Sequence, residues 1–342
     1  MSVSVRPLDP SHHSRWDDYV TRTSGGHFAS RVAWKELVEG WYGCRADWRF
    51  AERDGRVAGV MPLFERPAGR RARDLFSAPG GVLADDAEAA DALLASVRER
   101  VAHEGLELAE LRDQRQRWDG LETSEEHCTL ILALEPDPDA QWKRFDDKMR
   151  NQIRKAQKSG LMVRWGRDQL AAWHGVMLEN MRDLGTPLQG TDYFRRWLEA
   201  YQPDAEIGVV SRGDKAIGAL AIVRHADGMV NPWASSLRAY RAFCPGHLIY
   251  WEAIQRAIGL GLSWFEFGRS QWKSPTFAFK RSWGAAPVPL YYQYALGRAP
   301  HRPGLEDQKH AFALAVRLWQ HLPLAVAGAL GPPARRRFPE AL

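Results

Sequence analysis

The sequence is poor in cysteine and has no long apolar run. Its three cysteines, Cys44, Cys128 and Cys244, lie far apart, and none has a second metal ligand at a CxxC or HxxxH spacing. The sequence therefore predicts neither a disulfide framework nor a metal site. No stretch reaches the roughly 18 apolar residues that span a bilayer, and the opening residues MSVSVRPLDPSHH lack the apolar core of a signal peptide. We expect a cytoplasmic protein.

The excess of one charge sign is small. Lys and Arg number 47 against 42 Asp and Glu, which gives +5 over 342 residues. This balance does not predict nucleic-acid binding by the whole chain, and helix-turn-helix, zinc-finger and RNA-recognition patterns are absent. The motifs GxSxG and HExxH and the P-loop are absent as well. The sequence therefore excludes the hydrolase, metalloprotease and nucleotidase classes that depend on these motifs.

The residues that are present predict a folded protein of two domains. Hydrophobic residues make up 45% and charged residues 26%, as in soluble globular chains. The length favours two domains, at roughly 100–200 residues per domain. The segment Glu135-Pro136-Asp137-Pro138 breaks the pattern as a linker does. We expect a first domain over 1–137, a second over 138–300, and a helical tail over 301–342.

The same order of elements is predicted on both sides of this break. Alternating runs predict strands, the helical period predicts helices, and Asp54-Gly55 is a hairpin signal. In the first half we expect strands at 3–7, 46–53, 56–65, 106–111 and 128–134, and helices near 16–19, at 32–39 and at 85–104. In the second half we expect strands at 161–165, 206–211, 216–224, 228–236, 262–267 and 288–296, and helices at 139–159, 168–184, 191–200 and 246–259. The fold class is α/β (α+β), with one fold used twice.

The predicted helix 139–159 is amphipathic and strongly basic. Its apolar face holds Trp142, Phe145, Met149, Ile153 and Ala156, and its other face holds seven Lys and Arg residues. We interpret that face as a surface for a polyanion, with Arg150 and Asn151 as candidate substrate contacts. A solvated helix face is the alternative.

Two segments of the second half favour anion binding. Gly246, His247 and Leu248 open a predicted helix, where backbone amides can hold the phosphate or carboxylate of a cofactor. Arg269 and Ser270 follow the strand 262–267, and the carboxyl ends of strands open onto ligand sites in α/β sheets. We take these two as substrate-binding candidates, with an ordinary ion pair to a nearby glutamate as the alternative for Arg269.

Lys280 carries a charge into the aromatic segment TFAFKRSWG. A lysine there can stabilise the oxyanion that forms when an amine attacks an ester or thioester. The alternative is that its stem packs on Trp283 while its ammonium reaches water.

A strand and two aromatic residues complete the candidate site. Asn231, Trp233 and Ser235 alternate along the strand 228–236, so we expect them on one face, lining a pocket. A satisfied buried amide is the other interpretation of Asn231. Tyr250 and Trp283 are the remaining substrate-binding candidates.

The tail AFALAVRLWQHLPLAVAGALGPPARRRF joins an apolar stretch to an arginine cluster. Pro323 interrupts it, so it is too short to span a bilayer. We expect it to pack on the second domain, or else to lie on the inner membrane surface with its arginines at anionic headgroups.

Four ordered segments together resemble a known family. They are KMRNQIRKAQKSGLMV at 148–163, LGTPLQGTDYF at 184–194, FEFGRS at 265–270 and TFAFKRSWG at 276–284. The chain resembles the FemAB-related proteins over about residues 25–330, and most of all those associated with exosortase and PEP-CTERM systems. The resemblance implies two acetyltransferase-like (GNAT/Fem) domains and an N-acyltransferase or aminoacyltransferase that acts in cell-envelope or exopolysaccharide biosynthesis.

The resemblance also carries expectations for the site and the substrates. It implies Lys280 as the catalytic residue and Arg269 as an anion contact. It implies no tightly bound cofactor, a co-substrate that is acyl-CoA or aminoacyl-tRNA, and an acceptor that is a small-molecule, lipid-linked or nucleotide-linked envelope precursor. The helical RNA-binding arm of the peptidoglycan enzymes is missing from this sequence, which leaves the donor open. A non-catalytic assembly protein of an export or sorting system, built on the same fold, is the alternative function.

Overall fold

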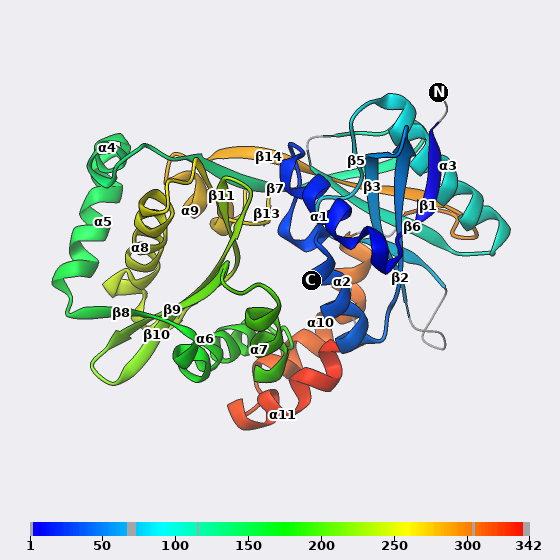
Figure 1. Ribbon diagram of the computed structural model, residues 1–342. Helices are drawn as coiled ribbons and strands as arrows, with labels where there is room; N and C mark the ends of the chain where they lie inside the picture. Colours follow the sequence, from blue (N-terminus) through cyan, green and yellow to red (C-terminus); the bar gives the residue numbers. More distant parts are fainter. Residues whose placement is uncertain (1–2, 67–72, 115, 303–304, 338–342) are drawn as a thin grey trace. The chain divides into compact units, whose positions relative to one another are not determined.

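The computed structural model describes residues 3–66, 73–114, 116–302 and 305–337 (Figure 1). The predicted α/β class is confirmed. The described chain forms two compact units, of which the first contains residues 3–128 and 288–302 and the second contains residues 129–287 and 305–337.

The first unit is a mixed sheet with helices packed on it, in the strand order β1-β2-β3-β4-β6-β14-β7. Its strands are β1 (Ser4–Pro7), β2 (Arg45–Arg53), β3 (Arg56–Glu65), β4 (Leu75–Ser77), β5 (Leu83–Ala84), β6 (Leu108–Gln114), β7 (Glu122–Ala133) and β14 (Ala286–Leu296). Its helices are α1 (His13–Arg22), α2 (Val32–Tyr42) and α3 (Ala87–His103). The predicted β2–β3 hairpin is confirmed, and Asp54 and Gly55 both have the positive φ that its turn requires.

Strand β14 belongs with the first unit, although it follows the second in sequence. It pairs antiparallel with β6, from Leu290 opposite Gln114 to Leu296 opposite Leu108. The alternating pattern of 288–296 predicted the strand, and sequence order placed it in the second domain. The partner of a strand is chosen by tertiary packing, which the local pattern does not contain.

A buried carboxyl group closes the end of the β4–β6 pair. Asp113, on β6, accepts hydrogen bonds from the Val82 amide at 2.8 Å and from Gln293 Nε2 at 2.8 Å. A Cβ atom on Gly81 would lie 2.3 Å from Asp113 Oδ1, so the backbone approaches closely there. Burial raises the pKa of Asp113 to about 7.

The second unit repeats the element order of the first, with the strand order β7-β12-β11-β10-β9-β8. Its further strands are β8 (Leu161–Trp165), β9 (Ala205–Arg212), β10 (Lys215–His225), β11 (Gly228–Ser236), β12 (Trp264–Glu266) and β13 (Ser270–Gln271). Its helices are α4 (Pro138–Arg144), α5 (Asp147–Lys158), α6 (Leu170–Asp183), α7 (Thr191–Ala200), α8 (Pro245–Gly259), α9 (Pro275–Arg281), α10 (Leu305–Gln320) and α11 (Leu324–Arg335).

Helices cover both faces of this second sheet. Residues 217–223 of β10 are buried one after another, and successive residues of a strand point to opposite faces. Helices α6 and α8 both pack on β10 and β11. The strands that carry the site described below therefore belong to a sheet that helices cover on both faces.

The prediction of one helix over 139–159 is wrong, because two helices occupy this segment. Phe145 is extended between them, with a ψ of 143°, and its ring packs on Trp251 and Trp283. Asp146 then caps α5 by accepting a hydrogen bond from the Met149 amide at 2.7 Å. Burial of the Phe145 ring and the cap at Asp146 together stabilise two short helices more than the single helix that the apolar period indicated.

The C-terminal helices α10 and α11 both pack on α6 (Figure 1). Packing of the tail on the second unit is thus confirmed for its described part. Within the described ranges, no helix combines the length and apolar character needed to cross a membrane.

Candidate active site

The pairing of β11 with β12 is short and ends near the carboxyl ends of both strands. They pair in parallel from Gly228 opposite Trp264 to Val230 opposite Glu266. Beyond Val230, β11 continues beside β10 with a register shift that gives β11 one extra residue, a bulge that includes Asn231 and Pro232. The carboxyl ends of parallel strands are the places where ligands commonly meet an α/β sheet.

The side chain of Asn231 holds this bulge. Its Nδ2 donates to the carbonyls of Ala221 at 2.7 Å and Trp233 at 2.9 Å, and its Oδ1 accepts from the Tyr250 hydroxyl at 2.8 Å. Burial raises the pKa of Tyr250, so this hydroxyl stays protonated and can donate. Asn231 is the satisfied buried amide that was one interpretation of its sequence.

The expectation that Asn231 shares one face with Trp233 and Ser235 is wrong. Asn231 meets Tyr250 on α8, whereas the Trp233 ring packs edge-on against Phe194 and Trp197 of α7. Ser235 accepts a hydrogen bond from Asn180 of α6. The extra residue of the bulge shifts the alternation between 231 and 233, which turns these side chains to opposite faces. Proline inside a predicted strand is a signal for such a bulge.

Lys280 lies at the end of β12. Only 6% of the residue is exposed, and its Nζ donates to the carbonyls of Gly268 at 2.8 Å and Arg269 at 2.9 Å. Two backbone carbonyls therefore hold the ammonium in place, and it does not project freely into water. Gly268 has a φ of 73°, and a Cβ atom there would lie 2.7 Å from the Asn231 carbonyl oxygen. The segment held by Lys280 thus passes directly beside the bulge.

Helix α9, which carries Lys280, is an element that the sequence prediction omitted. Ser274 caps it by accepting from the Phe277 amide at 3.1 Å, and Pro275 takes the first helical position. Serine followed by proline is a helix-start signal that would have located it.

Three further predicted residues flank helix α9: Arg269 and Ser270 precede it, and Trp283 follows it. Arg269 is exposed, and Ser270 is buried with its Oγ lacking a hydrogen-bond partner among the described residues. Trp283 is buried, and its ring packs against Phe145 and Phe267. Trp283 thus supports the site from the core, where it does not reach solvent.

The start of α8 offers less to an anion than its sequence predicted. The amides of His247 and Leu248 donate to the Cys244 carbonyl at 3.1 and 3.3 Å, which leaves the Gly246 amide outside these bonds. Burial lowers the pKa of His247 to about 4, so its imidazole is neutral near pH 7 and adds no positive charge. Its ring lies 5.1 Å from that of Phe279.

Helix α5 brings its basic residues near this helix start. Gln152 Oε1 accepts from Cys244 Sγ at 2.7 Å, and α5 packs on α8. The positive charge of Lys155 acts on the Cys244 thiol, although burial is the larger effect and raises the pKa of that thiol. The predicted contacts Arg150 and Asn151 lie on α5, where Arg150 pairs with Asp147 and Asn151 accepts from Arg154.

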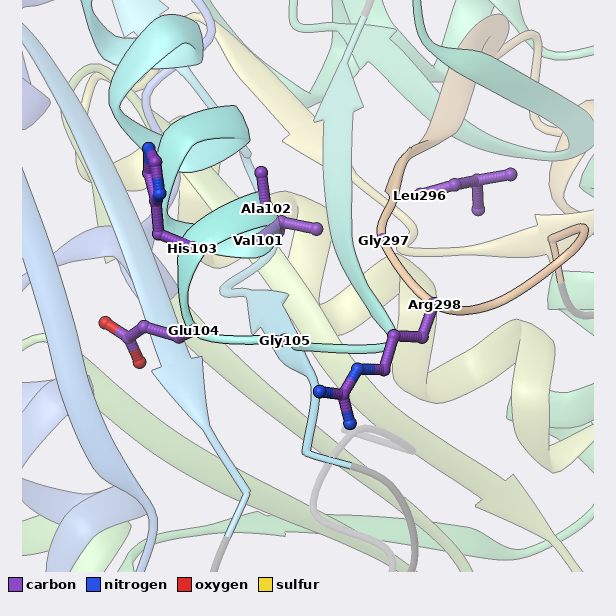
Figure 2. Close-up of a pocket in the computed structure, with 8 residues that line it drawn as sticks. All are labelled: Val101, Ala102, His103, Glu104, Gly105, Leu296, Gly297 and Arg298. Atoms are coloured by element: carbon purple, nitrogen blue, oxygen red, sulfur yellow. The ribbon is translucent and has the colours of Figure 1, made fainter.

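A hollow of about 390 Å³ lies in the first unit, where α3 and β14 end (Figure 2). None of the predicted site residues contributes to it. Its lining consists of Val101, Ala102, His103, Glu104, Gly105, Leu296, Gly297 and Arg298.

Comparison with known proteins agrees with this architecture. The profile of the acetyltransferase (GNAT) domain family matches residues 143–281, the segment that carries β11, β12 and Lys280. The fold is that of a tandem GNAT protein. The crystal structure of FemX has 16% sequence identity and a TM-score of 0.69, over 90% of this chain and 99% of that one.

Two other solved structures share the fold. A tandem GNAT protein from the clavulanic acid biosynthesis pathway has 12% identity and a TM-score of 0.56, over 88% of this chain and 100% of that one. The C-terminal domain of a putative lysylphosphatidylglycerol synthetase from Agrobacterium fabrum has 12% identity and a TM-score of 0.58, over 90% of this chain and 96% of that one. No curated protein matches the sequence significantly.

Proposed function

We propose that the second unit transfers an activated acyl or aminoacyl group to an amine, at the place where the pairing of β11 and β12 ends. One observation carries the proposal. The buried ammonium of Lys280, held by the carbonyls of Gly268 and Arg269, lies beside the bulge of β11, within the segment that matches the acetyltransferase domain. A fixed positive charge at the carboxyl ends of two parallel strands suits a reaction that develops negative charge on oxygen.

In the proposed step, the nitrogen of a neutral amine attacks the carbonyl carbon of the donor. A carbon–nitrogen bond forms, and the carbonyl oxygen becomes negative in the tetrahedral intermediate. The intermediate collapses with loss of the thiolate or alcohol leaving group, which takes the proton that the amine releases. The two carbonyl bonds of Lys280 hold its ammonium in place before the reaction, so little reorganisation is needed when the charge forms.

Different groups around Lys280 would bind different parts of the donor. We assign the anionic part of the donor to the exposed Arg269 and to the Gly246 amide at the start of α8. The basic face of α5 would attract a polyanionic donor. An acyl-CoA suits the GNAT domain match, and an aminoacyl-tRNA suits the FemAB resemblance.

The biological setting is the finer part of the proposal. The four motifs that resemble the FemAB-related proteins of exosortase and PEP-CTERM systems support a role in cell-envelope or exopolysaccharide biosynthesis. The acceptor would then be an amine on a small, lipid-linked or nucleotide-linked precursor.

Ligand-induced thermal stabilisation tests the donor. The purified full chain is heated with acetyl-CoA, longer acyl-CoAs, aminoacyl-tRNA or a uridine-diphosphate-linked sugar. A donor that binds the folded state stabilises it by about 2.7 kcal/mol at a hundredfold excess over its Kd. We expect one donor class to raise the Tm and the others to leave it unchanged.

Turnover with that donor then tests Lys280. The variant Lys280→Met should lose roughly 10²–10³ in kcat with little change in KM. The matched control is Lys273→Met, which removes an exposed lysine of the same segment. A folded Lys280→Met protein with normal turnover would refute the role of Lys280. Absence of binding by every donor would refute the transferase and favour the assembly protein.

A further inference from the structure

The outward faces of α10 and α11 expose an unusual amount of apolar side chain. In the part of the chain that the structure describes, four of the seven exposed large apolar residues lie on these two helices. Leu314 and Leu318, on α10, are 69% and 63% exposed, and Val326 and Leu330 lie on α11. Because each pair is four residues apart, each forms a stripe along its helix.

These stripes are separate from the faces that hold the helices to the protein. On α10, Val316 lies against Gly185, and Gln320 Nε2 donates to the Asp183 carbonyl. On α11, Ala327 and Gly331 are buried, and Gly331 packs against Leu188. Both helices are therefore already anchored on their inner faces, and the exposed stripes have no part in that anchoring.

The outer side of α11 lacks the polar residues of an ordinary surface helix. Every residue from 322 to 334 is apolar or glycine, whereas a surface helix of a globular protein normally has charged and polar residues on its outward face. The helix ends at three consecutive arginines, Arg335, Arg336 and Arg337. An apolar face bordered by charge of one sign is typical of a surface that contacts a membrane or another protein.

The charge pattern of these helices indicates which kind of partner they bind. Residues 313–337 contain four arginines and no aspartate or glutamate. A two-fold contact centred on the end of α11 would bring the same arginines together from both copies, which repels. A protein partner usually adds hydrogen bonds around an apolar centre, and residues 322–334 offer no side-chain donor or acceptor. A bilayer with anionic lipids satisfies both features, since it is apolar below and negative at the headgroups.

We propose that α10 and α11 dock the protein on an anionic lipid surface. The leucine and valine stripes enter the boundary between headgroups and acyl chains, and Arg317 and the arginines at the end of α11 bind lipid phosphates. The contact is peripheral, because no described helix is able to cross a membrane. This docking goes beyond the proposed transfer reaction and does not depend on it.

Vesicle co-sedimentation of the full chain tests the proposal. One set of vesicles contains phosphatidylethanolamine and phosphatidylglycerol, and the other contains only phosphatidylcholine. We expect the protein to bind the anionic vesicles at least tenfold more tightly, because each arginine near an anionic surface contributes roughly fivefold. Added salt should weaken the binding.

The decisive variant introduces one glutamate into each apolar stripe. Leu318→Glu combined with Leu330→Glu should reduce anionic-vesicle binding at least tenfold. The matched control is Leu260→Glu, which introduces the same change at a leucine that is 57% exposed after α8, and its binding should equal that of the wild type. The unfolding midpoint of each variant is measured alongside, since both leucines of the double variant are exposed and the fold should be kept.

Three results would overturn the proposal. The first is anionic-vesicle binding by the folded double variant that equals that of the wild type. The second is equal binding of the wild type to both kinds of vesicle, which would remove the role of the arginines. The third is absence of vesicle binding together with a concentration-dependent dimer that the double variant loses, which would assign the stripes to a second copy of the chain.

Discussion

The unfolding free energy of the first unit should depend on pH mainly through Asp113, and replacing Asp113 by asparagine should remove that dependence. Burial raises the pKa of Asp113 from 3.8 to about 7 in the folded state. Between these values the unfolded chain releases a proton that the folded chain keeps, so the unfolding free energy falls as the pH rises. Each pH unit costs about 1.4 kcal/mol, which amounts to about 4 kcal/mol over the whole window.

The measurement is denaturant unfolding at about pH 5 and about pH 8, where the wild type should lose roughly 3 kcal/mol through Asp113. Burial lowers the pKa of His174 and His247, and these groups act in the opposite direction, so the readout is the difference between wild type and Asp113→Asn. Hydrogen exchange of peptides that cover β6 localises the effect to the first unit.

The asparagine variant should be less stable than the wild type near pH 5, because its amide group faces the Nε2 donor of Gln293, and this difference should shrink or reverse by pH 8 as the wild type loses stability. The constant loss from the amide contact does not affect how steeply the unfolding free energy changes with pH. Asp91→Asn, which changes an exposed carboxylate on α3, serves as the control and should keep the wild-type slope. Parallel pH curves for wild type and Asp113→Asn would refute the reasoning.

Three further substitutions test the contacts of the site and the core. Tyr250→Phe leaves buried Asn231 without a donor and should lower the unfolding free energy by about 1–3 kcal/mol; an unchanged denaturation midpoint would contradict this. Gly268→Ala places a Cβ against the Asn231 carbonyl at positive φ and should cost about 1–3 kcal/mol, measured by thermal unfolding; Gly213→Ala has a positive φ but open space, so it is the control for backbone strain alone and should cost less. Arg100→Met removes a buried ion-pair partner from Glu65 and should cost about 3–5 kcal/mol, whereas Arg53→Met, in an exposed pair, should change denaturant stability little.

The local elements of this fold could be predicted because their signals are short in range. Asp54-Gly55 indicated the β2–β3 hairpin, and the helical period indicated α3 and α8. The division of 139–159 into two helices was missed, since it depends on burial of Phe145 against Trp251 of α8 and against Trp283, which follows α9. A helical period records which face is apolar, and it does not record where a neighbouring element requires the chain to bend.

The candidate site was predicted in part. The sequence placed Lys280 and Arg269 near a strand end, and the structure joins them through the carbonyl of Arg269. It also placed Asn231 beside Trp233 on one face, which the bulge prevents. Side-chain direction in a strand depends on an unbroken two-residue period, so one extra residue reverses it.

By itself, the sequence determined the α/β class and the repeated order of elements, because propensity and periodicity depend on neighbours along the chain. Only the tertiary structure decided that β14 joins the first unit, that the ammonium of Lys280 meets two backbone carbonyls, and that Val326 and Leu330 of α11 stay exposed. Each of these depends on which distant segments pack together, and that choice depends on the free energy of the whole fold.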